Sequence, residues 1–301
     1  MRPDLTTLLR PLAAIDLART LAPLRRGPHD LTCRAEDGVW WRATRTPEGP
    51  ATVRLEVLGD GTIRADAWGA GAASALESVP GWCGLLDDPS GFRADGLVGE
   101  LHRRNPGLRI GRTGAIFEAL APYVLEQRVS GLEAYRSWRR LVRGMSERAP
   151  GNVDLWLPPD PKRLAAEPYT AFHDFEIEAG RANTVRRAAA RAAGLERFAQ
   201  RTPAEARKAL MSLPGIGAWT AAMVTAVALG DVDAVPIGDY GIPGMVGHVL
   251  AGEGDADDAR MLELLEPFAP QRGRAIRLIA LAGNQPGRRA PRARIRSLRG
   301  R

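Results

Sequence analysis

The chain has 301 residues, of which 45% are hydrophobic and 26% charged, and this composition argues against a disordered protein and allows two or three packed lobes. No apolar stretch reaches transmembrane length, and charged residues interrupt the start MRPDLTTLLRPL, so we expect no signal peptide, no membrane partner and a cytoplasmic location. Cys33 and Cys83 are the only cysteines, too few for a structural zinc site, an iron–sulfur cluster or a disulfide framework.

The formal charge of +7 is carried by the C-terminal end of the chain. Residues 267–301 contain ten arginines and no acidic residue, so residues 1–266 together carry a formal charge of −3. Overall basicity therefore gives little support for a polyanion-binding body. Beyond Ala282 there is little to bury, and we expect residues 284–301 to form a basic, disordered tail that is either a solvated end or a nonspecific DNA-binding segment.

The first part of the chain has the pattern of a small antiparallel sheet. Between about 30 and 68 short runs of apolar residues alternate with polar ones, and Asp60-Gly61 predicts a turn before Ile63. A short helix at 72–79 follows, and Asp88-Pro89-Ser90-Gly91 predicts a break. We therefore expect a mixed α+β lobe at residues 1–95.

From about 113 the apolar pattern takes a helical period. Residues 152–161 predict a proline-punctuated connection, and 177–193 predict a further helix stopped by Gly194. The fold class is therefore α+β, with a sheet lobe followed by an all-helical part. The residues that define the helical pattern are Ile116, Phe117, Leu120, Val124, Leu132, Tyr135, Trp138, Leu141 and Val142.

The stretch from 202 to 230 predicts two helices joined by a very tight turn. Thr202-Pro203-Ala204-Glu205 is a capping box that begins a helix ending near Ser212. Leu213-Pro214-Gly215-Ile216-Gly217 then stops that helix, and a second one runs from Ala218 to Leu229. The free amides at the start of the second helix favour an anion, such as one phosphate of a nucleic acid.

Some twenty residues further on, Val235-Pro236-Ile237-Gly238-Asp239-Tyr240 precedes another helix. Asp239 is either a cap for that helix or a functional carboxylate, and the two roles are compatible. The apolar face of the helix is formed by Ile242, Met245, Val246, Val249 and Leu250.

The motif LPGIGAWTA followed by Asp239 resembles the helix-hairpin-helix DNA glycosylases. The resemblance implies that double-stranded DNA with a damaged base is the partner and that Asp239 is the catalytic carboxylate. It also implies a monovalent cation at the carbonyls of Leu213 and Gly215. Similar hairpins occur in polymerases, ligases and junction-binding proteins, so a DNA-binding module without catalysis is the alternative. The hairpin residues implied to contact DNA are Leu213, Pro214, Gly215, Ile216, Gly217 and Thr220.

One carboxylate can suffice for this chemistry. Breaking an N-glycosidic bond develops positive charge on the sugar, which an ionised carboxylate stabilises. The damaged base must first leave the stack, which requires a pocket and a side chain that fills the gap. In the resemblance, Gln127 matches a glutamine at the DNA-facing end of the first core helix. Arg128 then stands at the position of the wedge, with a solvated surface arginine as the alternative.

Weaker matches extend the resemblance to about residue 283. Residues 68–76 and 88–92 are similar to the N-terminal lobe of the bacterial DNA-3-methyladenine glycosylase II type, which implies a TATA-binding-protein-like sheet. We therefore expect residues 96–283 to form a glycosylase core of two helical lobes with the active cleft between them. The hairpin occupies 203–229 in this core.

Two departures from the family's patterns bear on activity. Trp219 stands where bifunctional members have a Schiff-base lysine, and Lys208 lies a helix away, so we expect base removal without strand cleavage. The four-cysteine cluster of the endonuclease III branch is absent, and the resemblance favours alkylated purines. Excision of oxidised guanine without lyase action is a further alternative.

The base pocket implied by the resemblance is less aromatic than in the alkylation-repair branch. Trp219 matches an aromatic residue there, whereas Met223 and Gln271 replace a tyrosine and a tryptophan, and Tyr240 completes the set. The histidines lack metal-ligand spacing, so we expect no catalytic metal. We also expect no cofactor and a monomeric protein. These histidines are His29, His102, His173 and His248.

Overall fold

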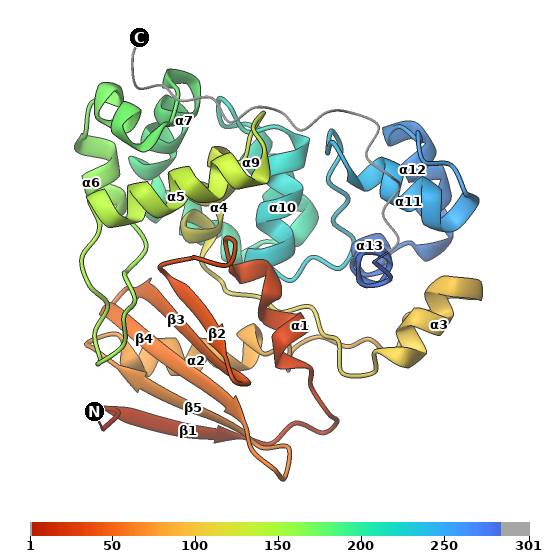
Figure 1. The fold of residues 1–301 in the computed structure, drawn as a ribbon, viewed down its shortest axis with the longest axis horizontal. Helices are drawn as coiled ribbons and strands as arrows, with labels where there is room; N and C mark the ends of the chain where they lie inside the picture. The colour runs from red at the N-terminus through yellow and green to blue at the C-terminus, as the bar shows by residue number, and fades with distance from the viewer. Residues whose placement is uncertain (1, 284–301) are drawn as a thin grey trace.

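The computed structural model describes residues 2–283, and its first part is a five-stranded antiparallel sheet (Figure 1). The strand order is β1-β5-β4-β3-β2, so the first strand pairs with the last, Leu5 opposite Ala67. The predicted sheet is confirmed, and β1 is an addition because its mostly exposed residues carry no alternating pattern. The strands are β1 (Leu5–Leu9), β2 (Cys33–Glu36), β3 (Val39–Thr46), β4 (Gly49–Val57) and β5 (Ile63–Trp68).

One face of the sheet is buried by α2 (Ala72–Trp82) and α1 (Leu17–Leu21). Alternate residues of β4 and β5, among them Val53 and Ala65, point to this core and are fully buried. The predicted helix at 72–79 is confirmed and continues to Trp82, whose side chain is 2% exposed. Both cysteines are free and buried, and burial raises the pKa of the Cys83 thiol to about 12.

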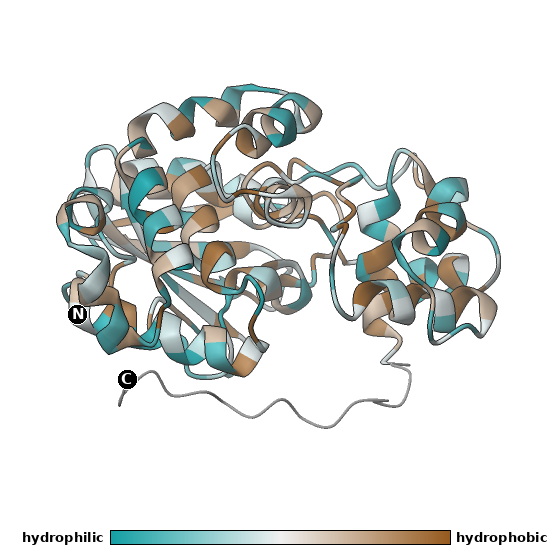
Figure 2. Ribbon diagram, turned by 90° about the horizontal axis from the view of Figure 1, so that it is seen from above, coloured by the Kyte–Doolittle hydropathy of each residue, from teal (hydrophilic) through white to brown (hydrophobic). Residues whose placement is uncertain are grey.

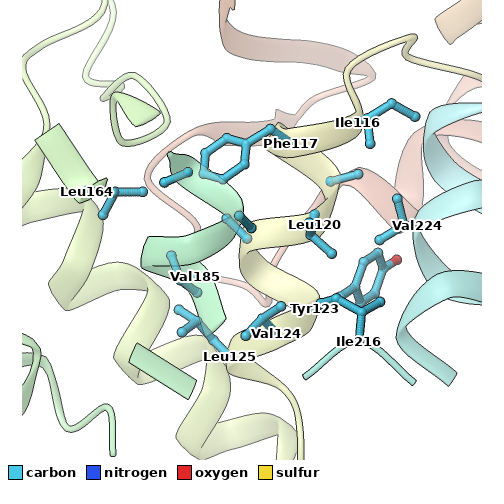
Figure 3. Packing of buried hydrophobic residues seen from close by; sticks show 14 of the residues in the cluster. Ile116, Phe117, Leu120, Tyr123, Val124, Leu125, Leu164, Val185, Ile216 and Val224 are labelled. Carbon is cyan, nitrogen blue, oxygen red and sulfur yellow. The ribbon is translucent and has the colours of Figure 1, made fainter. Parts of the chain in front are cut away.

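The first helical group is built around α4 (Ile116–Leu125), whose apolar side chains radiate into the core in Figure 3. Glu118 of α4 binds Arg42 and Thr44 of β3 at 2.5 and 2.7 Å, which fixes this helix to the sheet lobe. The other helices of the group are α5 (Gly131–Met145), α6 (Pro161–Ala166), α7 (Ala179–Ala189), α8 (Ala192–Glu196), α9 (Pro203–Met211) and α10 (Ala218–Ala228).

The helix predicted at 177–193 is wrong in its end point. It stops at Ala189, and Gly194 lies inside α8 rather than ending a helix. A straight continuation would turn Leu195 away from the face that carries Val185. The break brings both side chains into the same core, where each is at most 2% exposed.

The second helical group has its own core, and in Figure 2 it stands to one side of the rest of the molecule. It contains α3 (Gly96–Arg104), α11 (Ile242–Ala251), α12 (Asp258–Leu265) and α13 (Arg272–Leu281). The apolar face predicted for the helix after Asp239 packs here, with Met245 and Val246 buried. Short 3-10 helices lie at Ala22–Leu24, Tyr169–Phe175, Arg197–Gln200 and Glu266–Phe268.

Three of the ten C-terminal arginines belong to α13 and have structural partners. Arg272 binds Asp233, Arg277 binds the carbonyl of Arg19, and Arg274 is 1% exposed against Asp87. The predicted tail at 284–301 lies outside the described residues. Within residues 2–283, no helix combines the length and apolar character that a membrane crossing requires.

Candidate active site

The predicted hairpin forms between α9 and α10. The capping box of Thr202 and Glu205 is confirmed, and the turn at 212–217 reverses the chain before α10. Gly215 has φ +90°, and a Cβ there would lie 2.4 Å from Oγ1 of Thr184, so only glycine fits. Gly217 begins α10 without a side-chain cap, which leaves the first amides of this helix free for an anion.

Gln127 fastens the end of α4 to both sides of this turn. Its Nε2 donates to the carbonyl of Gly215 at 3.0 Å and to Oγ1 of Thr220 at 2.8 Å. Arg128 follows with an exposed side chain and a left-handed backbone at φ +57°, which is uncommon for a residue with a side chain. The two residues singled out by the resemblance therefore lie directly beside the hairpin.

Asp239 lies on the segment between the two helical groups, and its carboxylate faces both. Oδ1 accepts hydrogen bonds from the amides of Gly241 and Ile242 at 2.8 and 2.9 Å, so it satisfies the first free amide of α11, whose N-cap residue is Gly241. Oδ2 accepts a hydrogen bond from Nε1 of Trp219 at 2.7 Å. Asp258 of α12 supports the loop by accepting from the amide of Gly238 at 2.9 Å.

All of these hydrogen bonds to Asp239 come from neutral donors. Within residues 2–283, no lysine or arginine nitrogen forms a salt bridge with its carboxylate. The neighbouring Glu126 differs, because it pairs with Arg26 at 3.2 Å. Burial raises the pKa of Glu126, Arg26 opposes that rise, and the charge of Asp239 adds to it. Of these two carboxylates, Asp239 is thus the one without a cationic partner.

Trp219 packs in a cluster with Tyr123 of α4 and Arg26 of the sheet lobe. Its ring meets that of Tyr123 edge to face, with centroids 6.0 Å apart at 87°. The guanidinium carbon of Arg26 lies 4.0 Å from the centroid of Tyr123, which is 2% exposed. No motif indicates Arg26 in the sequence. For Tyr123 the sequence favours core packing over a place in the base pocket.

The other residues assigned to the base pocket are spread out. Met223 is half-buried one turn after Trp219 and packs on the same core, whereas Tyr240 is 94% exposed. Gln271 accepts a hydrogen bond from Nε of Arg274 at 2.6 Å and lines a cavity with Arg112. The structure therefore brings Trp219, Asp239 and the hairpin together and places Gln271 with other partners.

The groups that could act as ligands are acidic, histidine and cysteine side chains for a metal, and the hairpin carbonyls for a monovalent cation. In the part of the chain that the structure describes, no group of three or more histidine, cysteine, aspartate or glutamate side chains could hold a metal ion. The carbonyl of Leu213 accepts from the amide of Ile216 at 3.1 Å, and that of Gly215 accepts from Gln127. Each carbonyl oxygen keeps a second lone pair that suits a monovalent cation.

Comparison with known proteins yields matches among solved structures. No protein-family model matches the chain, and no curated protein matches its sequence. A 3-methyladenine DNA glycosylase from Archaeoglobus fulgidus superposes with a TM-score of 0.79 at 19% identity, covering 92% of this chain and 98% of the other. A structure described as MBOgg1 in complex with a low-affinity DNA ligand has a TM-score of 0.71 at 18% identity, covering 93% and 96%.

A third structure is the 8-oxoguanine glycosylase/lyase of Clostridium acetobutylicum bound to double-stranded DNA. It superposes with a TM-score of 0.70 at 15% identity, covering 93% of this chain and 97% of the other. At this level of identity the likeness concerns the fold. The chain has the α+β fold of these three glycosylase structures, and the predicted fold class is confirmed.

Proposed function

We propose that the protein is a monofunctional DNA glycosylase of base excision repair, which hydrolyses the N-glycosidic bond of a damaged purine with Asp239 as the catalytic carboxylate. The observation that carries the proposal is the pairing of Asp239 with Trp219 beside the hairpin. The carboxylate accepts hydrogen bonds from three neutral donors, and within residues 2–283 no salt bridge offsets its negative charge. That charge is what an oxocarbenium-like sugar requires.

Each part of the site has a task in this reaction. The free amides at Gly217 bind the DNA backbone, and the carbonyls of Leu213 and Gly215 would hold a monovalent cation that would supply positive charge beside it. Gln127 keeps the turn in place, and Arg128 fills the gap left by the extruded nucleotide. Asp239 stabilises the sugar cation and orients the attacking water.

Trp219 supports base release without strand cleavage. An indole nitrogen cannot form the Schiff base that a lysine forms with the sugar, and here it is engaged with Asp239. We expect the substrate to be an alkylated purine, released by a DNA-3-methyladenine glycosylase II type of reaction in the cytoplasm. Oxidised guanine is the second candidate, since an 8-oxoguanine glycosylase/lyase has the same fold.

The test uses purified protein and duplexes that each carry one defined lesion. We expect free base from a duplex with an alkylated purine, and a strand break only after alkali. Release from 8-oxoguanine duplexes alone would select the second candidate. Binding without release from any lesion would overturn the enzyme assignment and leave a DNA-binding module. Borohydride trapping of a covalent adduct would overturn the monofunctional assignment.

A further inference from the structure

The hairpin packs against α7, and the two lie side by side at the top of Figure 1. The contact is Thr184, whose Oγ1 lies so close to Gly215 that it would block a Cβ there. The same hydroxyl donates to the carbonyl of Gly180 at 2.9 Å, so Thr184 is fixed in its own helix. A side chain that neighbours Thr184 on α7 therefore has a fixed position beside the turn at Gly215.

The next turn of α7 presents Arg187 at this position. Its Nη2 donates to Oγ1 of Thr184 at 3.3 Å, and the side chain is exposed. Within the described residues Arg187 forms no salt bridge, although arginines with carboxylate partners are frequent in this chain. Nearly all of its donors thus face solvent next to the hairpin.

The other arginines of the helix have partners inside the protein. Arg181 is buried and donates to the carbonyl of Leu125 at 2.7 Å. Arg186 donates to the carbonyl of Glu167 at 2.5 Å. Arg187 therefore differs from Arg181 and Arg186, because it is exposed and its hydrogen-bond acceptor is a hydroxyl rather than a backbone carbonyl.

We propose that Arg187 binds a phosphodiester group of the DNA strand held by the hairpin, so that the backbone-binding site extends from the start of α10 onto α7. The inference rests on the proposed DNA partner. A guanidinium recognises a phosphate through charge and two parallel donors, and the free amides of α10 favour a neighbouring phosphate of the same strand. Such a contact reads no sequence and no lesion.

The experiment measures binding of an undamaged duplex at several salt concentrations. For Arg187→Gln we expect about fivefold weaker binding near 0.1 M salt, and a salt slope of log K reduced by about 0.9, the value for one phosphate contact. Arg187→Lys keeps the charge and should keep the slope. Arg103→Gln is the matched control, because Arg103 is exposed on α3, far from α7 in Figure 1.

The outcomes separate a phosphate contact from the alternatives. An Arg187→Gln affinity and slope that match those of Arg103→Gln would overturn the proposal. Equal losses in Arg187→Gln and Arg187→Lys with an unchanged slope would show a role in packing and would also overturn it. Undamaged DNA needs no base excision, so these readouts stand even if no lesion is cut.

Discussion

Replacing Asp239 by asparagine removes one negative charge and leaves the shape of the side chain almost unchanged. The asparagine Oδ1 can still accept from the amides of Gly241 and Ile242, so the cap of α11 is retained. Its Nδ2 then faces Nε1 of Trp219, and two donors meet where a hydrogen bond existed. We expect this mismatch to cost about 1–2 kcal/mol of stability, well short of unfolding.

The expected effect on catalysis is much larger. A carboxylate about 4 Å from a sugar cation contributes about 4 kcal/mol at the effective dielectric constant typical of protein sites, which corresponds to about a thousandfold in rate. Trp219→Phe is the matched control for the lost hydrogen bond, because it removes the donor and leaves the charge. Its rate should fall by about tenfold, the worth of one hydrogen bond to a charged group.

The assay is single-turnover base release from a duplex with one alkylated purine, at protein concentrations well above the dissociation constant. Binding of the same duplex is measured in parallel, and Asp239→Asn should retain it. A rate for Asp239→Asn within tenfold of wild type would refute the reasoning. Asp239 would then be a helix cap whose charge takes no part in the reaction.

Three further predictions follow from the contacts of the site. Gly215→Val should weaken binding of damaged and undamaged duplexes alike by at least about tenfold, because its positive φ and the contact with Thr184 exclude a side chain; a binding titration checks this. Gln127→Ala should lower stability by about 1–2 kcal/mol in urea denaturation, since the bonds to the hairpin are lost. Burial raises the pKa of Glu126 in the folded state, so its contribution to stability is full at low pH and is lost as pH rises through that pKa. The free energy of unfolding of the wild type minus that of Glu126→Gln should therefore fall as pH rises above about 4.3, the ordinary pKa of glutamate, and a constant difference would contradict the shift.

Most of the fold could be predicted because its signals are local. The turn at Asp60-Gly61 and the capping box at Thr202 act within four residues, and both are found where the sequence places them. Strand β1 could not be predicted, because its pairing with β5 lies some sixty residues away and its residues are largely exposed. The break after Ala189 depends likewise on where Leu195 must pack.

The site divides in the same way. The order of hairpin, spacer and aspartate can be read along the sequence. It indicates the segment around Asp239, which lies beside the hairpin in the structure. The contribution of Arg26 is different, because it reaches Glu126 across 100 residues and from another lobe. Gln271 is the opposite case. Sequence order matches it to a pocket position, but in the structure its side chain accepts a hydrogen bond from Arg274.

The hydrogen bonds of Asp239 make its two possible roles separable. Capping the start of α11 needs only one carboxylate oxygen, and both amides there donate to Oδ1. The bond from Trp219 to Oδ2 adds nothing to the cap, but it joins the first helical group to the segment that leads into the second. It also fixes the orientation of a carboxylate that forms no salt bridge with any of the described residues. A residue serving only as a cap would not require a half-buried indole ring to orient its second oxygen, so this bond is the feature that the cap alone leaves unexplained.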